Sequence, residues 1–231
     1  MIEYVFVPPP IPSVEIAGSD QRFPVHRIYC VGRNYADHVR EMGSDVKEPP
    51  VFFTKPADAI VASGVAVPYP PRTENFHYEV ELVIAVGGAG RNIPAAQALD
   101  HVFGYAVGND LTRRDLQGAA KKTGRPWDFG KAFAQSAPIS EIHRAADIGH
   151  PSNGSIWLDV NGKRRQTGDL KDLIWDVPNT LSFLSQYYDL MPGDLIYTGT
   201  PAGVAAVVAG DTLHGHVDGL SDLRITVSQP V

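Results

Sequence analysis

The sequence predicts a single α+β domain that is rich in antiparallel strands, and three observations support this fold class. Short apolar runs bounded by glycine or proline recur along the chain, whereas only three segments have helical spacing. The pair Asn161-Gly162 lies between two alternating runs, which is typical of a β-hairpin. With 231 residues, of which 43% are hydrophobic, the chain can form a sizeable core.

Composition also limits the partners and the location of the protein. The net charge of −6 at pH 7 gives no broad basic field, so nucleic acid is not an expected partner. The N-terminus lacks a signal-peptide pattern, and no apolar run is long enough to span a membrane. We therefore expect a cytoplasmic protein with no membrane partner. The single cysteine, Cys30, lies in an apolar run and is expected to be a core residue.

The first 25 residues are rich in proline and have little periodicity. The run "PPPIP" favours an extended backbone without ladder hydrogen bonds. We expect residues 1–25 to form an extended arm laid on the body or on a partner subunit, and residues 26–231 to form one domain.

The elements of this domain follow from local patterns. Strands are expected at 27–32, 50–56, 77–87 and 103–112, in a hairpin over 155–166, and at 193–204 and 210–227. Helices are expected at 34–43 with Asn34 as N-cap, at 93–102, and at 177–190 with a proline near its start. The polar segment 113–133 is interrupted by glycines, so we expect a mobile loop there.

The expected strand over 77–87 contains two carboxylates, Glu79 and Glu81, in an otherwise apolar run. Side chains alternate across a strand, so both carboxylates point to one face, where they repel each other and resist burial. A divalent cation would remove this conflict, and Asp110 at the end of the 103–112 strand offers a third carboxylate. Oxygen ligands favour Mg²⁺ or Mn²⁺ over zinc. The alternative is that both glutamates lie on the solvated face of an edge strand.

A second candidate group lies in the expected helix at 34–43. His38 and Glu41 are three residues apart there and are therefore neighbours on one helix face. A glutamate that accepts a hydrogen bond from one imidazole nitrogen leaves the other nitrogen as an oriented general base. The alternative is a surface helix on which the two residues are incidental neighbours. The other seven histidines have no comparable partner, and we expect them to be structural or surface residues.

The segment 113–133 contains six basic residues. Lys131 lies between apolar neighbours, where a lysine is partly buried and requires an anion. If the chain turns helical after the preceding strand, Arg114 and Gln117 fall on the side of the acidic cluster. Two further lysines are expected to be solvated: Lys121 and Lys122.

Six motifs follow one another along the chain: "VGRNYADHVREMG", "PVFFTKP", "YEVELVIAVG", "GYAVGNDLTRRDLQ", "GRPWDFGKAF" and "GDLIYTGTPAGV". In order and spacing they resemble the fumarylacetoacetate hydrolase family, in its acylpyruvate hydrolase branch, from Arg27 to the C-terminus. The resemblance implies a mixed β-roll of several sheets with peripheral helices, usually in a homodimer. It also implies hydrolysis of the C–C bond of a 2,4-dioxo acid, such as fumarylpyruvate in gentisate-type aromatic degradation.

The same resemblance implies roles for individual residues. Mg²⁺ or Mn²⁺ is expected to bind to Glu79, Glu81 and Asp110. The expected catalytic residues are His38 and Glu41, as a dyad on a lid, and Lys131. The expected substrate contacts are Gln117 and Thr200. Apart from the resemblance, the distal carboxylate of fumarylpyruvate needs a cation, for which Arg33 and Arg114 are candidates and Lys55 is a further candidate.

The same metal platform would also serve other reactions. The nearest alternative is an oxaloacetate decarboxylase, and a second is an isomerase or decarboxylase that acts on hydroxymuconate-type diacids. The pair His38 and Glu41 favours hydrolysis, because attack by water needs a base. A binding module with a structural metal is an alternative from another class, and such a module would unfold when the metal is removed.

Overall fold

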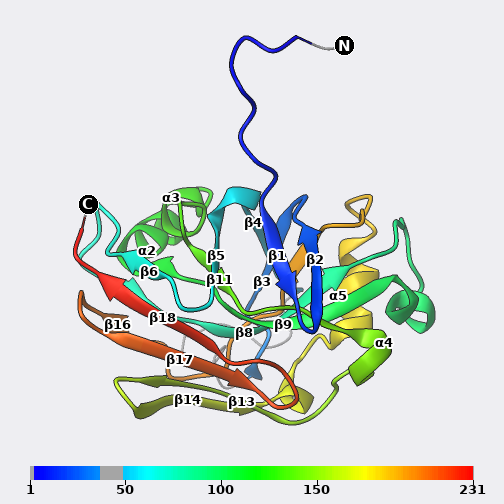
Figure 1. Ribbon diagram of the computed structural model, residues 1–231. Coiled ribbons are helices and arrows are strands. Elements are labelled where there is room, and N and C mark those ends of the chain that lie inside the picture. Colours follow the sequence, from blue (N-terminus) through cyan, green and yellow to red (C-terminus); the bar gives the residue numbers. More distant parts are fainter. Residues whose placement is uncertain (1–2, 37–48, 231) are drawn as a thin grey trace.

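Two large β-sheets pack face to face, with further small elements around them, as Figure 1 shows. The computed structural model describes residues 3–36 and 49–230. The larger sheet consists of β3 (Ile28–Gly32), β4 (Val51–Lys55), β5 (Ile60–Ala62), β8 (Val80–Val86), β9 (Val102–Asn109), β11 (Ala137–Ile139), β12 (His143–Arg144) and β15 (Leu195–Tyr197). Its strand order is β4-β3-β15-β8-β9-β11-β5, with β12 paired to β9 and with both parallel and antiparallel neighbours. The predicted β-rich α+β class is confirmed.

The smaller of the two sheets covers one face of β8 and β9. Its strands are β6 (Ala66–Pro68), β13 (Ser155–Val160), β14 (Lys163–Asp169), β17 (Thr212–Val217) and β18 (Leu223–Ser228), in the order β14-β13-β17-β18-β6. Asn161 and Gly162 form the turn between β13 and β14 with φ values of 52° and 73°, which is the left-handed conformation that a two-residue hairpin requires. The predicted hairpin is confirmed.

Strand β8 is buried along its whole length because both of its faces are covered. Leu82 and Ile84 belong to the core between the two large sheets. Val83 and Ala85 point the other way, into a second core that includes the free cysteine Cys30. Side chains alternate along β8, so those at odd-numbered positions, such as Val83, lie on the side away from the smaller sheet. This side holds the candidate site.

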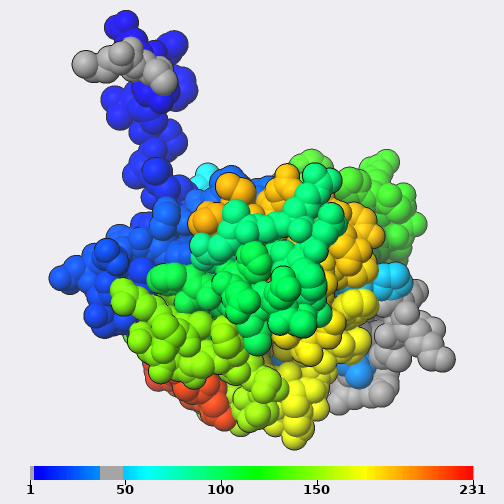
Figure 2. Space-filling model, turned by 90° about the vertical axis from the view of Figure 1, so that its right-hand side faces the viewer, coloured from blue at the N-terminus to red at the C-terminus, as the bar shows by residue number. Residues whose placement is uncertain are grey.

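The N-terminal segment differs from the expected arm in its second half. Residues 13–24 form an antiparallel hairpin of β1 (Ser13–Ile16) and β2 (Ser19–Pro24), which buries Val14, Ile16 and Phe23 in the second core. Alternation of apolar and polar residues explains this hairpin better than the proline content does. Residues 3–12 stand off the body as an exposed segment (Figure 2).

A third, smaller sheet and several helices complete the described part of the chain. The sheet contains β7 (Phe76–His77), β10 (Thr112–Arg113) and β16 (Ala206–Val207). The helices are η1 (Ala57–Ala59), η2 (Ala95–His101), α2 (Arg114–Lys122), α3 (Asp128–Lys131), α4 (Ala145–Ile148), η3 (Leu170–Asp172) and α5 (Val177–Leu184). None of the helices described is long and apolar enough to cross a membrane.

The expectation of a mobile loop over 113–133 is wrong, because this segment folds into α2 and α3. Tertiary contacts outweigh the cost of the glycines, which is about 1 kcal/mol each in a helix interior. The carboxylate of Asp115 accepts hydrogen bonds from Thr73 Oγ1 (2.6 Å) and from the backbone N–H of Glu74 (3.0 Å), which anchors the start of α2. Gly130 permits close packing of the two helices, since a Cβ there would lie 2.8 Å from the backbone nitrogen of Gln117.

His216→Gln should lower stability most at mildly acidic pH. Both imidazole nitrogens of His216 contact carboxylates, Asp222 at 2.7 Å and Asp218 at 3.1 Å. Burial lowers the pKa of His216, but these two hydrogen bonds outweigh burial and raise the pKa above its usual value. The stabilisation is therefore complete below about pH 6 and is lost as the pH rises through the folded-state pKa. Thermal unfolding of both proteins across this range measures the effect, and a difference in melting temperature that stays constant with pH would contradict it.

Candidate metal centre and active site

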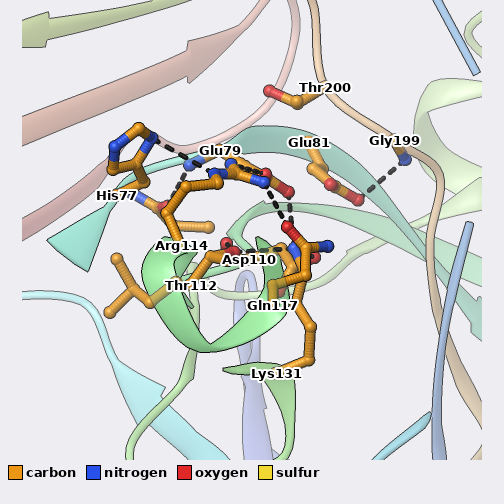
Figure 3. Close-up of polar contacts among 12 residues, drawn as sticks. His77, Glu79, Glu81, Asp110, Thr112, Arg114, Gln117, Lys131, Gly199 and Thr200 are labelled. Atoms are coloured by element: carbon orange, nitrogen blue, oxygen red, sulfur yellow. Dashed lines mark hydrogen bonds and ion pairs between the residues drawn. The ribbon is translucent and has the colours of Figure 1, made fainter. Parts of the chain in front are cut away.

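Three carboxylates meet where β8 begins and β9 ends. The strands are antiparallel with Val80 opposite Asn109, which places Glu79 and Glu81 beside Asp110. One carboxylate oxygen from each acid lies within 4.8 Å of the others, and all three residues are buried. Glu79 lies in the gap between β7 and β8 rather than in one continuous strand, yet it points to the same place as Glu81 (Figure 3). The structure thus brings the three acids together as predicted, and the solvated-face alternative is wrong.

Lys131 of α3 neutralises part of this acidic charge. Its Nζ donates to Glu79 Oε2 at 2.8 Å, to Asp110 Oδ2 at 2.5 Å and to Thr112 Oγ1 at 2.6 Å, which uses all three ammonium hydrogens. Burial lowers the pKa of Lys131, but the charges of Asp110 and Glu79 outweigh burial and raise it, so the lysine is charged. A buried lysine with anionic partners is what the sequence predicted. A direct contact with substrate stays a prediction, and it would require Lys131 to release one of these partners.

Lys55 of β4 pairs with the other oxygen of Asp110. Its Nζ lies 2.8 Å from Asp110 Oδ1 and also donates to the backbone carbonyls of Leu111 (3.2 Å) and Lys131 (2.5 Å). The side chain of Lys55 has 0% exposure, so the suggestion that it binds a distal carboxylate of the substrate is wrong. Sequence reasoning missed its actual role because Leu111 and Lys131 lie 56 and 76 residues further along the chain, and Asp110 lies next to Leu111.

Arg114 connects the acidic cluster to α2 (Figure 3). Its guanidinium donates to Glu79 Oε1, to Gln117 Oε1 at 2.6 Å and, through Nε, to His77 Nδ1 at 3.3 Å. His77 Nε2 lies 2.7 Å from Asn75 Oδ1, which assigns the imidazole hydrogen to Nε2. Burial and then the charge of Arg114 lower the pKa of His77 to about 4, so the imidazole is neutral.

The role of His77 at the site was not predicted, because a structural or surface position was expected for it. Its position two residues before Glu79 could have indicated the site, since residues two apart in an extended chain point to the same side.

Glu81 has a different set of partners from the other two acids. Its Oε2 accepts a hydrogen bond from the backbone N–H of Gly199 at 2.7 Å. Gly199 has a φ of 97°, and a Cβ there would lie 2.7 Å from the Cβ of Asn34, so this N–H can be aimed at Glu81 only from a glycine. No lysine or arginine of the described chain forms an ion pair with Glu81. Burial, followed by the charges of Asp110 and Glu79, raises the pKa of Glu81 well above its usual value.

This donor set fits a hard divalent cation. It contains carboxylate oxygens and neither thiolate nor imidazole, which suits Mg²⁺ or Mn²⁺ rather than Zn²⁺. A cation among the three acids would oppose the repulsion that acts on Glu81 and would supply the positive charge that this residue lacks. Within residues 3–36 and 49–230, no other group of acids, histidines or cysteines has comparable spacing.

The acids line one pocket together with the residues predicted to contact substrate, which are Arg33, Arg114, Gln117 and Thr200. Gln117 accepts from Arg114 with its carbonyl oxygen, so its amide N–H groups are left for the pocket. Thr200 Oγ1 accepts from Gln166 Nε2 at 2.8 Å, which fixes the hydroxyl at the pocket wall.

Two further sequence predictions concern the dyad and the solvated lysines. His38 and Glu41 lie outside the described residues, so the dyad stays a prediction. Lys121, expected to be solvated, lines the pocket, and its Nζ lies 4.9 Å from the centre of the Trp127 ring. That expectation is wrong because α2 places Lys121 on the same helix face as Arg114.

The β-rich scaffold and the buried acidic cluster together define a class of protein, an enzyme whose acids could hold a divalent metal where the central strands β8 and β9 meet. The chain matches the family described as "Fumarylacetoacetate (FAA) hydrolase C-terminal" over residues 27–228, and it belongs to this family.

Individual relatives are similar over most of their length. The chain is 48% identical over 180 residues to a fumarylpyruvate hydrolase of Ralstonia sp., covering 78% of this chain and 93% of the relative. It is 42% identical over 203 residues to the human mitochondrial oxaloacetate tautomerase FAHD1, covering 88% and 92%. The crystal structure of fumarylpyruvate hydrolase from Pseudomonas aeruginosa in complex with Mn²⁺ and pyruvate matches with a TM-score of 0.97 and 52% identity, over 98% of this chain and all of that one.

Lys55→Met should destabilise the protein strongly when no divalent metal is present. Removing Lys55 leaves the buried Oδ1 of Asp110 without its cation, while Oδ2 keeps Lys131, and breaking a buried ion pair costs about 3–5 kcal/mol. Denaturant unfolding in the presence of a chelator measures the free energy of unfolding. Lys171→Met is the matched control, because its pair with Asp169 is solvent-exposed and its loss should have little effect. Equally small losses in both variants would contradict the role given to Lys55.

Glu81→Gln should weaken the binding of divalent metal, because it removes a negative ligand. The loss of affinity for Mn²⁺ should exceed the roughly 10- to 100-fold that follows the loss of an outer-shell partner. Titration calorimetry of the metal-free protein with Mn²⁺ measures this change. Glu74→Gln replaces a nearby exposed acid and should bind Mn²⁺ like the unmodified protein. Unaltered binding by Glu81→Gln would exclude Glu81 as a ligand.

Proposed function

We propose that the protein is a metal-dependent hydrolase that cleaves the C–C bond of a 2,4-dioxo acid, with fumarylpyruvate as substrate and fumarate and pyruvate as products. The observation that carries this proposal is the buried cluster of Glu79, Glu81 and Asp110 in a pocket lined by cations and an amide donor. The two relatives named fumarylpyruvate hydrolase support it. The proposal includes Mg²⁺ or Mn²⁺ as cofactor, a homodimer, a cytoplasmic location and a role in gentisate-type aromatic degradation.

The residues of the pocket have distinct roles in this reaction. A divalent ion bound to the three acids supplies Lewis-acid stabilisation of negative charge on the substrate oxygens. Arg114 and Lys131 hold Glu79 in position through their hydrogen bonds. Gln117 donates an amide hydrogen to the C4 oxygen as that oxygen becomes negative, an interaction often worth several kcal/mol in a water-poor site. Thr200 lies at the pocket wall, where its hydroxyl can contact the substrate carboxylate.

His38 and Glu41 move the protons. His38, oriented by Glu41, removes a proton from water, and the resulting hydroxide adds to C4. The C3–C4 bond then breaks, and its electron pair leaves with C3 as the enolate of pyruvate. The protonated His38 returns the proton to C3, so that one water is consumed and one molecule each of fumarate and pyruvate is formed.

A second candidate activity is the tautomerisation of oxaloacetate, favoured by the 42% identity to the human oxaloacetate tautomerase. Tautomerisation moves a proton between C3 and the 2-oxo oxygen, and it needs a base but no attack by water. The sequence suggested decarboxylation as the reaction of oxaloacetate, whereas this relative is named for tautomerisation. Hydrolysis is distinguished from both because it alone yields a second carboxylic acid from the acyl group.

The experiment that tests the proposal follows the enol absorbance of fumarylpyruvate with Mn²⁺ or with chelator and then identifies the products. We expect loss of absorbance, with fumarate and pyruvate formed only when metal is present. In the same assay His38→Ala should be about 10²- to 10⁴-fold slower, the usual contribution of a general base, while still binding Mn²⁺. His150→Ala, which alters an exposed histidine, is the control.

Two results would contradict the proposal. If fumarylpyruvate were not cleaved while oxaloacetate was converted rapidly, the tautomerase would replace the hydrolase. A fully active His38→Ala variant would remove His38 from water activation.

A further inference from the structure

Lys121 occupies a particular place on α2. Arg114, Gln117 and Lys121 follow one another at spacings of three and four residues, so they lie along one face of the helix. With a rise of 1.5 Å per residue, Lys121 lies roughly 10 Å along the helix axis from Arg114. All three side chains line the pocket of the acidic cluster. The helix therefore carries a row of polar groups that leads away from the acids, with Lys121 at its far end.

Two cations of the pocket that lie beside the acids already form hydrogen bonds with other protein groups. Lys131 donates all its hydrogens to protein oxygens, and Arg114 donates to Glu79, Gln117 and His77. Lys121 differs from them, since no carboxylate in the described part of the chain forms an ion pair with it. Its Nζ instead lies 4.9 Å from the centre of the Trp127 ring.

The surroundings of Lys121 suit a planar, conjugated anion. Trp127 and Phe53 are in contact, with ring centroids 5.5 Å apart, and both line the pocket. Flat unsaturated chains pack well on such aromatic faces. Burial, followed by the charges of Arg114 and Arg33, lowers the pKa of Lys121 to about 8, so the cations at this end of the pocket repel one another. A bound carboxylate would relieve this repulsion.

We propose that Lys121 binds the distal carboxylate of a dicarboxylic 2,4-dioxo acid and thereby favours diacids over substrates that lack the second carboxylate. The inference rests on the proposed hydrolase function and deepens it. With the dioxo end of the substrate at the acidic cluster, its acyl group has to extend away from the acids. Along α2 this acyl group meets Lys121, beside the aromatic wall of Trp127 and Phe53 and in the pocket that Arg33 also lines.

The test compares two substrates that share the dioxo end. Fumarylpyruvate carries a distal carboxylate, and acetylpyruvate carries a methyl group in place of the unsaturated acid. For Lys121→Met, the ratio of kcat/KM for fumarylpyruvate to kcat/KM for acetylpyruvate should fall about 10- to 100-fold, the range expected for one charge-assisted hydrogen bond. The loss should appear mainly in KM for fumarylpyruvate. Lys121→Arg should restore most of the ratio, and Lys122→Met, at an exposed neighbour, should leave it unchanged.

The outcomes separate this inference from the proposed function. If the unmodified enzyme cleaves both substrates and Lys121→Met slows both equally, or neither, the inference is overturned and the hydrolase stands. If the unmodified enzyme cleaves neither substrate, the proposed function itself fails. Melting temperatures of the variants show whether any loss of activity reflects loss of the fold.

Discussion

The compensation of buried carboxylate charge is the constraint on which the rest of the site depends. Three acids are held in a space where an unpaired ion costs several kcal/mol, and protein cations balance most of that charge. Lys55 comes from β4, Lys131 from α3 and Arg114 from α2. Each cation therefore ties a separate segment of the chain to the junction of β8 and β9. The position of the two short helices follows from this need as much as from their own helix propensity.

The two faces of the central strands have different roles, since one packs in the core and the other carries the acids of the site. One face of β8 packs against the smaller sheet through aliphatic side chains such as Leu82 and Ile84. The opposite face carries Glu81 at its start and then returns to small apolar residues. Gly108, opposite Glu81 in the register, has no side chain because a Cβ there would lie 2.4 Å from Val83 and 2.5 Å from Tyr197. The tight packing behind the acids thus holds their backbone rigidly while leaving their front open to the pocket.

The parts of this arrangement that could be predicted are those encoded locally. Alternation identified the strands, the pair Asn161-Gly162 identified the hairpin, and two acids in an apolar strand identified the cluster. The helices over 113–133 were missed because their stability comes from contacts with distant segments rather than from their own composition. The same reason applies to the contact of Lys55 with Leu111 and to that of His77 with Arg114, whose partners lie 56 and 37 positions apart in the sequence.

Within the described chain, some cations of the site are paired with the acids and Lys121 is not, and this difference also explains how a protein with a net charge of −6 can attract an anionic substrate. Net charge acts over the whole surface and is screened within about 10 Å at moderate salt, whereas a pocket with low-dielectric walls concentrates the field of the charges that line it. At the acidic end of the pocket, the charges of Lys55 and Lys131 are neutralised by ion pairs with the carboxylates, so these lysines attract an incoming anion only weakly. Among the described residues, Lys121 lies near Arg33 and Arg114, whose charges lower its pKa, so an anion bound at this end of the pocket would be stabilised. In the proposed reaction, a substrate with a negative charge at each end would be oriented by this asymmetry. Its dioxo end would need a divalent cation among the acids, whereas its other end would need only the side chains of the protein.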